Sequence, residues 1–169
     1  MKSHSTKTRH DRRRTLIITV CCVLATLIGA RASARAAEVN TGYFGNTAIM
    51  GYDTVAYFTM KKAVKGSKQH SHEWLGGTWL FASDKHRKSF IINPLKYAPQ
   101  YGGLCSVGVG YGEVTREIDP EAWSVIKGKL YLNYAKNVTE EFDANSEELI
   151  AKADKNWPSV KTALSSWKP

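Results

Sequence analysis

Cys105 is the residue whose type and setting suggest chemistry most directly. Three cysteines are present, but Cys21 and Cys22 lie in an apolar stretch that we expect to be removed, which leaves one thiol in a glycine-rich segment. A lone thiol cannot form an internal disulfide. It is therefore a buried small side chain, a metal ligand or a reactive nucleophile, and the sequence leaves all three alternatives open.

Histidine and methionine side chains supply candidate partners for a metal site at this thiol. His72 is the leading partner. The weaker candidates are His70, His86 and Met60. Thiolate, imidazole and thioether ligands favour soft or borderline ions, so the sequence predicts a transition metal, copper or zinc, held by Cys105 and His72. In the alternative interpretation, His72 packs its ring on Trp74 or bonds a backbone carbonyl.

A Cys–His pair also suggests nucleophilic catalysis. His72 would activate the thiol, Asp53 or Glu73 would orient His72, and glycines beside Cys105 would present backbone N–H groups to an oxyanion. However, no protease or thiol-peroxidase signature surrounds Cys105, and the chain has no Cys-x-x-Cys pair. The sequence therefore favours a non-enzymatic protein. A structural or protein-interaction module is the second hypothesis, and a thiol-dependent enzyme is the third.

Residues 1–36 have the features of an export signal, of the general secretory or twin-arginine type. A basic start precedes an apolar run at 15–30, and small residues around 32–36 provide Ala-x-Ala cleavage sites. The apolar run is shorter than the about 20 residues that a membrane span needs. We therefore expect cleavage, a periplasmic or secreted product, and no stable membrane span after cleavage.

Removal of this segment changes the charge of the chain. Residues 1–36 carry 8 of the 24 basic residues but only 1 of the 15 acidic residues, so the remainder has a formal charge of +2 instead of +9. No basic stripe is left, which argues against nucleic acid as a partner. The expected partner is a metal ion or an unknown protein, and the oligomeric state stays open.

The elements expected to position these residues form one α+β domain at 51–158, after an irregular lead-in at 37–50. We expect a strand at 52–58, a basic loop at 59–71 and a hairpin that turns at Gly76-Gly77. Ser83 should cap a helix at 84–92, and Asn93 should cap a helical turn that begins at Pro94. The glycines at 101–112 predict a tight loop in which the backbone packs closely.

The C-terminal third resembles the middle of the chain. Residues 53–57 resemble 119–123, 77–81 resemble 128–132, and Phe90 and Phe142 lie in the charged segments that follow. We therefore predict two degenerate strand–strand–helix units, the second at 118–157. A capping-box pattern at 145–148 opens a final helix that Pro158 should end near Trp157, with a tail at 159–169.

The segment at 50–101 resembles the YHS domain, a member of the treble-clef-like, TRASH-related metal-binding superfamily. That family has Asp-Pro-Val-Cys, then a hairpin, then Tyr-Phe-Cys-Ser-x-x-Cys, and then Phe, Pro and Tyr at fixed spacing. The corresponding residues here are 53–56, 80–86, Phe90, Pro94 and Tyr97. Blocks at 51–58, 71–74, 97–105 and 118–123 are similar to those of the exported, cysteine-poor bacterial YHS proteins. The resemblance implies a small fold of hairpins and short helices.

The departures from the YHS pattern concern its metal ligands. Ala56 and Ala82 stand where the family has two of its cysteines, and His86 stands where it has another. A methyl group cannot coordinate a metal, so the usual thiolate cage cannot form. Cys105 lies beyond this cysteine set, in a block shared with the cysteine-poor group, where His72 is its leading neighbour.

Overall fold

The computed structural model describes residues 38–166. The predicted export signal and the last three residues of the predicted tail lie outside the described residues. Within 38–166, no helix is both long and apolar enough to cross a membrane.

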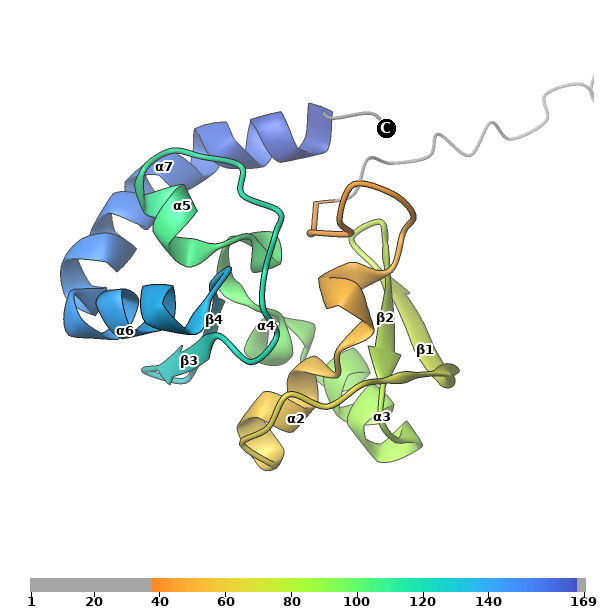
Figure 1. Ribbon diagram of the computed structural model, residues 1–169. Helices are drawn as coiled ribbons and strands as arrows, with labels where there is room; N and C mark the ends of the chain where they lie inside the picture. Colours follow the sequence, from red (N-terminus) through yellow and green to blue (C-terminus); the bar gives the residue numbers. More distant parts are fainter. Residues whose placement is uncertain (1–37, 167–169) are drawn as a thin grey trace, which may run out of the picture. The chain divides into compact units, whose positions relative to one another are not determined.

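The structure confirms an α+β fold built from two small antiparallel hairpins and short helices (Figure 1). The first half contains η1 (Ala48–Gly51), α2 (Thr54–Thr59), β1 (Ser67–Trp74), β2 (Gly77–Phe81), α3 (Asp84–Ile92) and α4 (Pro94–Tyr97). The second half contains η2 (Gln100–Gly103), α5 (Ser106–Gly110), β3 (Trp123–Ile126), β4 (Lys129–Leu132), α6 (Lys136–Ala144) and α7 (Ser146–Ser166).

The two halves repeat one another at a constant spacing of 52 residues. We call residues 48–93 the first repeat and 100–145 the second repeat. The turns η1 and η2 both contain three successive residues of positive φ, and α2 and α5 follow them after the cap residues Asp53 and Cys105. Helices α3 and α6 begin and end 52 residues apart, and so do their buried phenylalanines, Phe90 and Phe142.

This spacing corrects the alignment expected from the sequence. The predicted repeat paired Gly77 with Gly128, whereas the structure pairs Gly76 with Gly128. Both hairpins turn on two residues of positive φ, Leu75-Gly76 and Lys127-Gly128, which is the geometry of a type I′ turn. Gly77 is instead a strand residue, where a Cβ would lie 2.8 Å from Val39. The counterpart of Asp53 is Cys105 and not Asp119.

Two segments adopt helix where the sequence predicted other structure. The run at 52–58 is largely helix α2 and not a strand, because the Asp53 carboxylate accepts hydrogen bonds from the amides of Val55 and Ala56 and so caps a helix. The glycine segment at 101–112 contains most of η2 and all of α5. Close packing is confirmed at Gly108, where a Cβ would lie 2.6 Å from Thr115 Oγ1.

Other local predictions are confirmed. Ser83 caps α3, and Asn93 caps α4, which begins at Pro94. Strand β1 begins at Ser67, however, so the predicted basic loop is shorter than expected.

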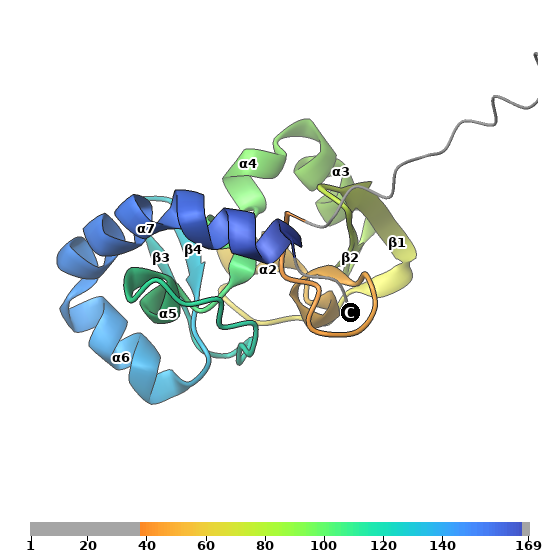
Figure 2. The ribbon, with the colours of Figure 1, turned by 90° about the horizontal axis from the view of Figure 1, so that it is seen from above.

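Helix α7 continues through Pro158 to Ser166, so the predicted end near Trp157 is wrong. Buried residues lie on both sides of the proline, Leu149 and Ala153 before it and Val160 and Leu164 after it. Packing of this face offsets the hydrogen bond that proline removes. The helix lies along α5 in both views (Figures 1 and 2).

Two clusters of buried side chains form the interior. The first core is built mainly by the first repeat around Trp79, Phe81 and Phe90, and it also receives Leu130 and Leu132 from β4. The second core contains Cys105, Tyr131, Phe142 and the buried face of α7. Strand β4 therefore contributes to both cores, which ties the two repeats together.

Candidate functional site

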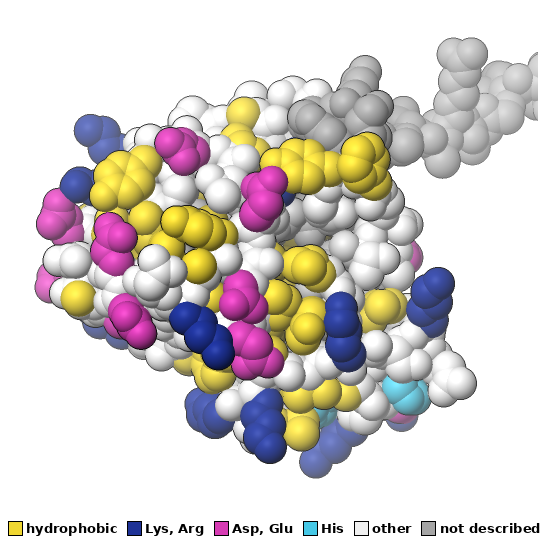
Figure 3. Space-filling model, viewed as in Figure 1, with side chains coloured by type: hydrophobic (Ala, Val, Ile, Leu, Met, Phe, Trp, Pro, Cys, Tyr) yellow, Lys and Arg dark blue, Asp and Glu magenta, His cyan; other side chains and the backbone are white. Residues whose placement is uncertain are grey.

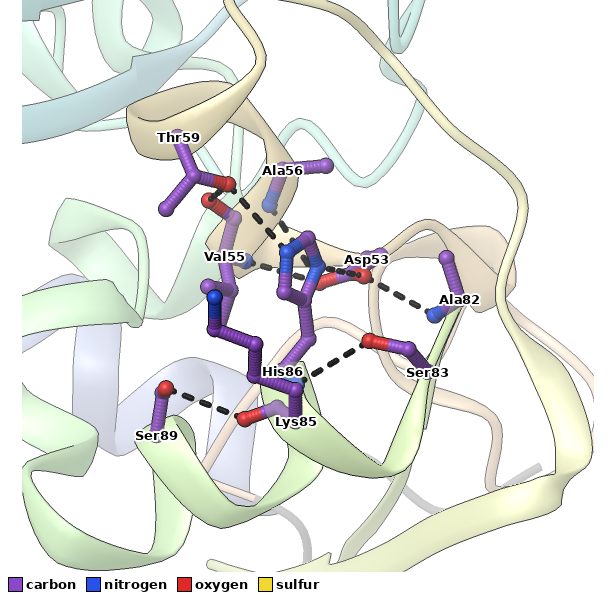
Figure 4. A network of polar contacts seen from close by, with 9 residues as sticks. All are labelled: Asp53, Val55, Ala56, Thr59, Ala82, Ser83, Lys85, His86 and Ser89. Carbon is purple, nitrogen blue, oxygen red and sulfur yellow. Dashed lines mark hydrogen bonds and ion pairs between the residues drawn. The ribbon is translucent and has the colours of Figure 1, made fainter.

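Asp53 is the centre of a polar network in the first repeat (Figure 4). Its side chain is 0% exposed. Oδ1 accepts from the amides of Val55 and Ala56, and Oδ2 accepts from the amide of Ala82 at 2.8 Å. Oδ2 also lies 2.6 Å from Nδ1 of His86. One carboxylate therefore connects the start of α2, the end of β2 and the first turn of α3.

His86 extends this network to the surface. Since a carboxylate only accepts hydrogen bonds, Nδ1 of His86 is the donor to Asp53. Nε2 lies 3.3 Å from Oγ1 of Thr59, the last residue of α2. The histidine side chain is only 13% exposed. Nδ1 of His86 is thus already bound to Asp53, and only Nε2, which faces Thr59, would remain for the predicted weaker role as a metal ligand.

The order carboxylate, imidazole, hydroxyl is also the order of a hydrolase triad. The Thr59 hydroxyl, however, donates a 3.0 Å hydrogen bond to the carbonyl of Val55 in its own helix. The oxygen that would attack a substrate is thus bound to the backbone of α2. The contacts of this network join structural elements, and the network therefore suits a structural role better than a nucleophilic one.

The three positions at which the YHS pattern has cysteine all lie against this carboxylate. The amides of Ala56 and Ala82 donate to it, and the ring of His86 pairs with it. Positions 56, 82 and 86, which are far apart in the sequence, thus all contact one buried carboxylate. The hydrogen bond between Asp53 and His86 lies where the resemblance would put metal ligands.

Cys105 occupies the same position in the second repeat that Asp53 has in the first. Their backbone amides make equivalent hydrogen bonds, from Asp53 to the carbonyl of Val64 and from Cys105 to that of Thr115. The Cys105 side chain is 1% exposed and its Sγ lies 3.8 Å from Oδ1 of Asn133. It also lines a cavity of about 250 Å³. The thiol is thus a buried group at the edge of an open space.

The other predicted ligands do not gather around Cys105. The ring of His72 faces Phe90 of the first core, with centroids 6.4 Å apart, whereas Cys105 belongs to the second core. His70 lies on β1, and Met60 is half-exposed after the end of α2. Among residues 38–166, no three His, Cys, Asp or Glu side chains form a group that could hold a metal ion.

The sequence interpretation missed the pairing of Asp53 with His86. It considered the Asp53 carboxylate only as a group that would orient His72, whereas the structure pairs it with His86. One sequence signal was available, since His86 replaces a residue that faces the family's metal. A histidine at such a position can turn toward the nearest buried carboxylate, which here is Asp53.

Comparisons with family models, with curated proteins and with solved structures found no match to this chain. The resemblance to the YHS domain therefore rests on the sequence motifs alone.

Proposed function

We propose that this protein is an exported, non-enzymatic interaction module of YHS type in which the buried contact between Asp53 and His86 takes the place of the metal. One observation carries the proposal: the backbone amides of Ala56 and Ala82 and the ring of His86 all bind the buried carboxylate of Asp53. Asp53 and His86 join the end of β2 to α2 and α3 without a metal.

Exposed apolar side chains support a role in binding a partner. Ile92 and Leu95, on either side of the short link between α3 and α4, are two of the most exposed large hydrophobic residues in the described chain. Neighbouring apolar side chains of this kind are common at protein interfaces. Export and the YHS assignment remain part of the proposal and rest on the sequence.

Elemental analysis after loading with copper or zinc tests the proposal. We expect the purified protein to retain no stoichiometric metal after dialysis and its melting temperature to be insensitive to a chelator. A variant with cysteine at positions 56, 82 and 86 serves as the positive control. We expect it to bind zinc, because it returns thiolate ligands to the three positions at which the YHS pattern has cysteine.

The alternative, a copper or zinc site at Cys105 and His72, makes the opposite prediction. The protein would then retain about one ion per chain, and Cys105→Ser or His72→Ala would remove it. That result, or retention of a metal that His86→Ala removes, would overturn the proposal. Failure of the three-cysteine variant to bind zinc would also count against it, because the three positions would then not form a metal cradle.

A further inference from the structure

The cavity beside Cys105 lies in the second repeat, between α5 and α6. Its volume is about 250 Å³. The residues that matter for its chemistry are Cys105, Tyr111, Glu113, Tyr134, Val138 and Glu141. Cys105 and Tyr111 flank α5, whereas Val138 and Glu141 lie on α6. The cavity thus opens between the two helices that correspond to α2 and α3 of the first repeat.

The spacing of 52 residues explains why this space is open. In the first repeat, the ring of His86 fills the gap between Asp53 and Thr59. In the second repeat the position of His86 belongs to Val138, which is shorter and has no polar atom. Cys105 turns to Asn133 and does not bridge to α6. The first repeat therefore fills this place with the ring of His86, and the second repeat leaves a cavity there.

The wall of the cavity combines aromatic rings with carboxylates. Tyr111 and Tyr134 are 61% and 52% exposed. Glu113 and Glu141 are exposed, and neither forms an ion pair with another residue of 38–166. Figure 3 shows hydrophobic side chains in the region of α5 and α6, with several Asp and Glu side chains and some Lys or Arg side chains around them.

The lysine of α7 that interacts with Tyr111 is paired within its own helix. Lys152 of α7 interacts electrostatically with Tyr111. Its ammonium group lies 2.6 Å from a carboxylate oxygen of Glu148, so it is paired within its own helix. No lysine or arginine lines the cavity. The lining itself thus contains two carboxylates and no cation, which favours a positively charged ligand.

We propose that this cavity binds a small organic cation of the alkylammonium class. The faces of Tyr111 and Tyr134 would attract the cation and cover its methyl or methylene groups. Glu113 and Glu141 would neutralise its charge, while Cys105 and Val138 provide the apolar floor. The site is separate from Asp53 and His86, so this proposal holds whether or not the first repeat binds a metal.

A titration followed by amide NMR tests this site, with choline as the probe and its neutral carbon isostere as the control ligand. We expect saturable shifts of the amides of Cys105, Tyr111 and Tyr134 with choline and much smaller ones with the isostere. The variant Glu113→Gln/Glu141→Gln should weaken binding about tenfold. The matched control Glu140→Gln, also on the exposed face of α6, should bind as the unaltered protein does.

A second variant fills the cavity from inside. Val138→His places an imidazole where the first repeat has His86, and it should abolish the choline-induced shifts while the remaining amide spectrum stays folded. Equal binding of choline and its isostere would overturn the proposal. So would shifts confined to other parts of the protein, the absence of saturable shifts, or undiminished binding by a folded Val138→His variant.

Discussion

Asp53 and Cys105 occupy equivalent positions in the two repeats, yet the two side chains act differently. The Asp53 carboxylate binds three backbone amides and the ring of His86, and so joins three elements. The Cys105 thiol makes one weak contact, with Asn133. The same backbone position therefore holds a carboxylate bound to His86 in the first repeat and a thiol beside a cavity in the second repeat.

Asn133 provides the side-chain cap of α5 in the second repeat, where the carboxylate of Asp53 has no counterpart. It is fully buried at the end of β4, and its Oδ1 accepts a hydrogen bond from the amide of Val107 in the first turn of α5. In the first repeat the cap residue Asp53 serves this function itself, and the counterpart of Asn133 is the apolar Phe81. The helix cap is thus kept in both repeats but comes from different elements, which frees position 105 for a thiol.

The surface grooves differ in the same way. A groove of about 200 Å³ in the first repeat is lined by Trp74, Leu75, Trp79 and Leu95. Its counterpart, of about 370 Å³, has Ile126, Lys127, Tyr131 and Glu147 at the equivalent positions. At these four positions the first groove is apolar and the second carries both charges, although the first groove is also lined by the ion pair of Lys161 with Glu38. The two repeats have therefore diverged at the surface as well as at Asp53 and Cys105, while their hairpins and helices stayed in register.

The largest expected effect comes from removing the first of these two side chains. Asp53→Ala should reduce the free energy of unfolding by about 3–5 kcal/mol, because it leaves His86 without its partner and removes the side-chain acceptor of the Val55, Ala56 and Ala82 amides. Cys105→Ala removes one small buried side chain and should cost about 1 kcal/mol. Urea unfolding of both variants measures the difference. Equal losses would show that Asp53 is not the centre of the first repeat.

A double-mutant cycle measures the interaction between Asp53 and His86. Asp53→Cys and His86→Val introduce the residues of the second repeat, and the double variant should be destabilised less than the two single variants together. We expect a coupling of about 1–3 kcal/mol, since each single change leaves a buried polar partner unpaired. Additive losses would mean that the 2.6 Å contact adds nothing beyond the separate packing of its two side chains.

The local elements could be predicted from the sequence more easily than the site. The hairpin, the Ser83 cap and the turn at Asn93-Pro94 depend on neighbouring residues, and all three are present, although the hairpin turns at Leu75-Gly76 and not at the predicted Gly76-Gly77. The pairing of Asp53 with His86 joins residues 33 apart, so no local pattern specifies it. Helix α7 passes Pro158 because distant packing outweighs a local signal. The sequence shows the repeat only as weak similarity between the two halves. The 52-residue offset that pairs them became clear from the positions of the turns in the structure.

Buried tyrosines in each repeat predict a loss of stability at alkaline pH. Burial is the main cause that raises the pKa of Tyr57 and of Tyr101 above the usual 10.0, and a hydrogen bond to Asp154 adds to it at Tyr101. The folded state therefore favours the protonated phenols. Their contribution to stability is present below pH 10 and declines as the pH rises above that value.

Phenylalanine substitutions separate the two tyrosines. At neutral pH, Tyr57→Phe should cost about 1 kcal/mol, because the Pro120 carbonyl loses its 2.9 Å hydrogen bond. The difference from the unaltered protein should shrink above pH 10, since phenylalanine cannot ionise. Tyr101→Phe should behave likewise. Thermal unfolding between pH 7 and pH 11 checks both, and a constant difference across this range would refute the assignment.

The hairpin turns give the smallest expected effect and the most closely matched pair of sites. Leu75 and Lys127 both adopt positive φ, at 49° and 50°, which is strained for either side chain and better tolerated by asparagine. Lys127→Asn should therefore stabilise the protein by about 0.5 kcal/mol, because Lys127 is exposed. Leu75→Asn relieves the same strain but loses contacts in the groove beside Trp74 and Trp157. Urea unfolding should show a smaller gain in stability, or a net loss, for Leu75→Asn than for Lys127→Asn. Equal gains would mean that the contacts of Leu75 in this groove contribute nothing to stability.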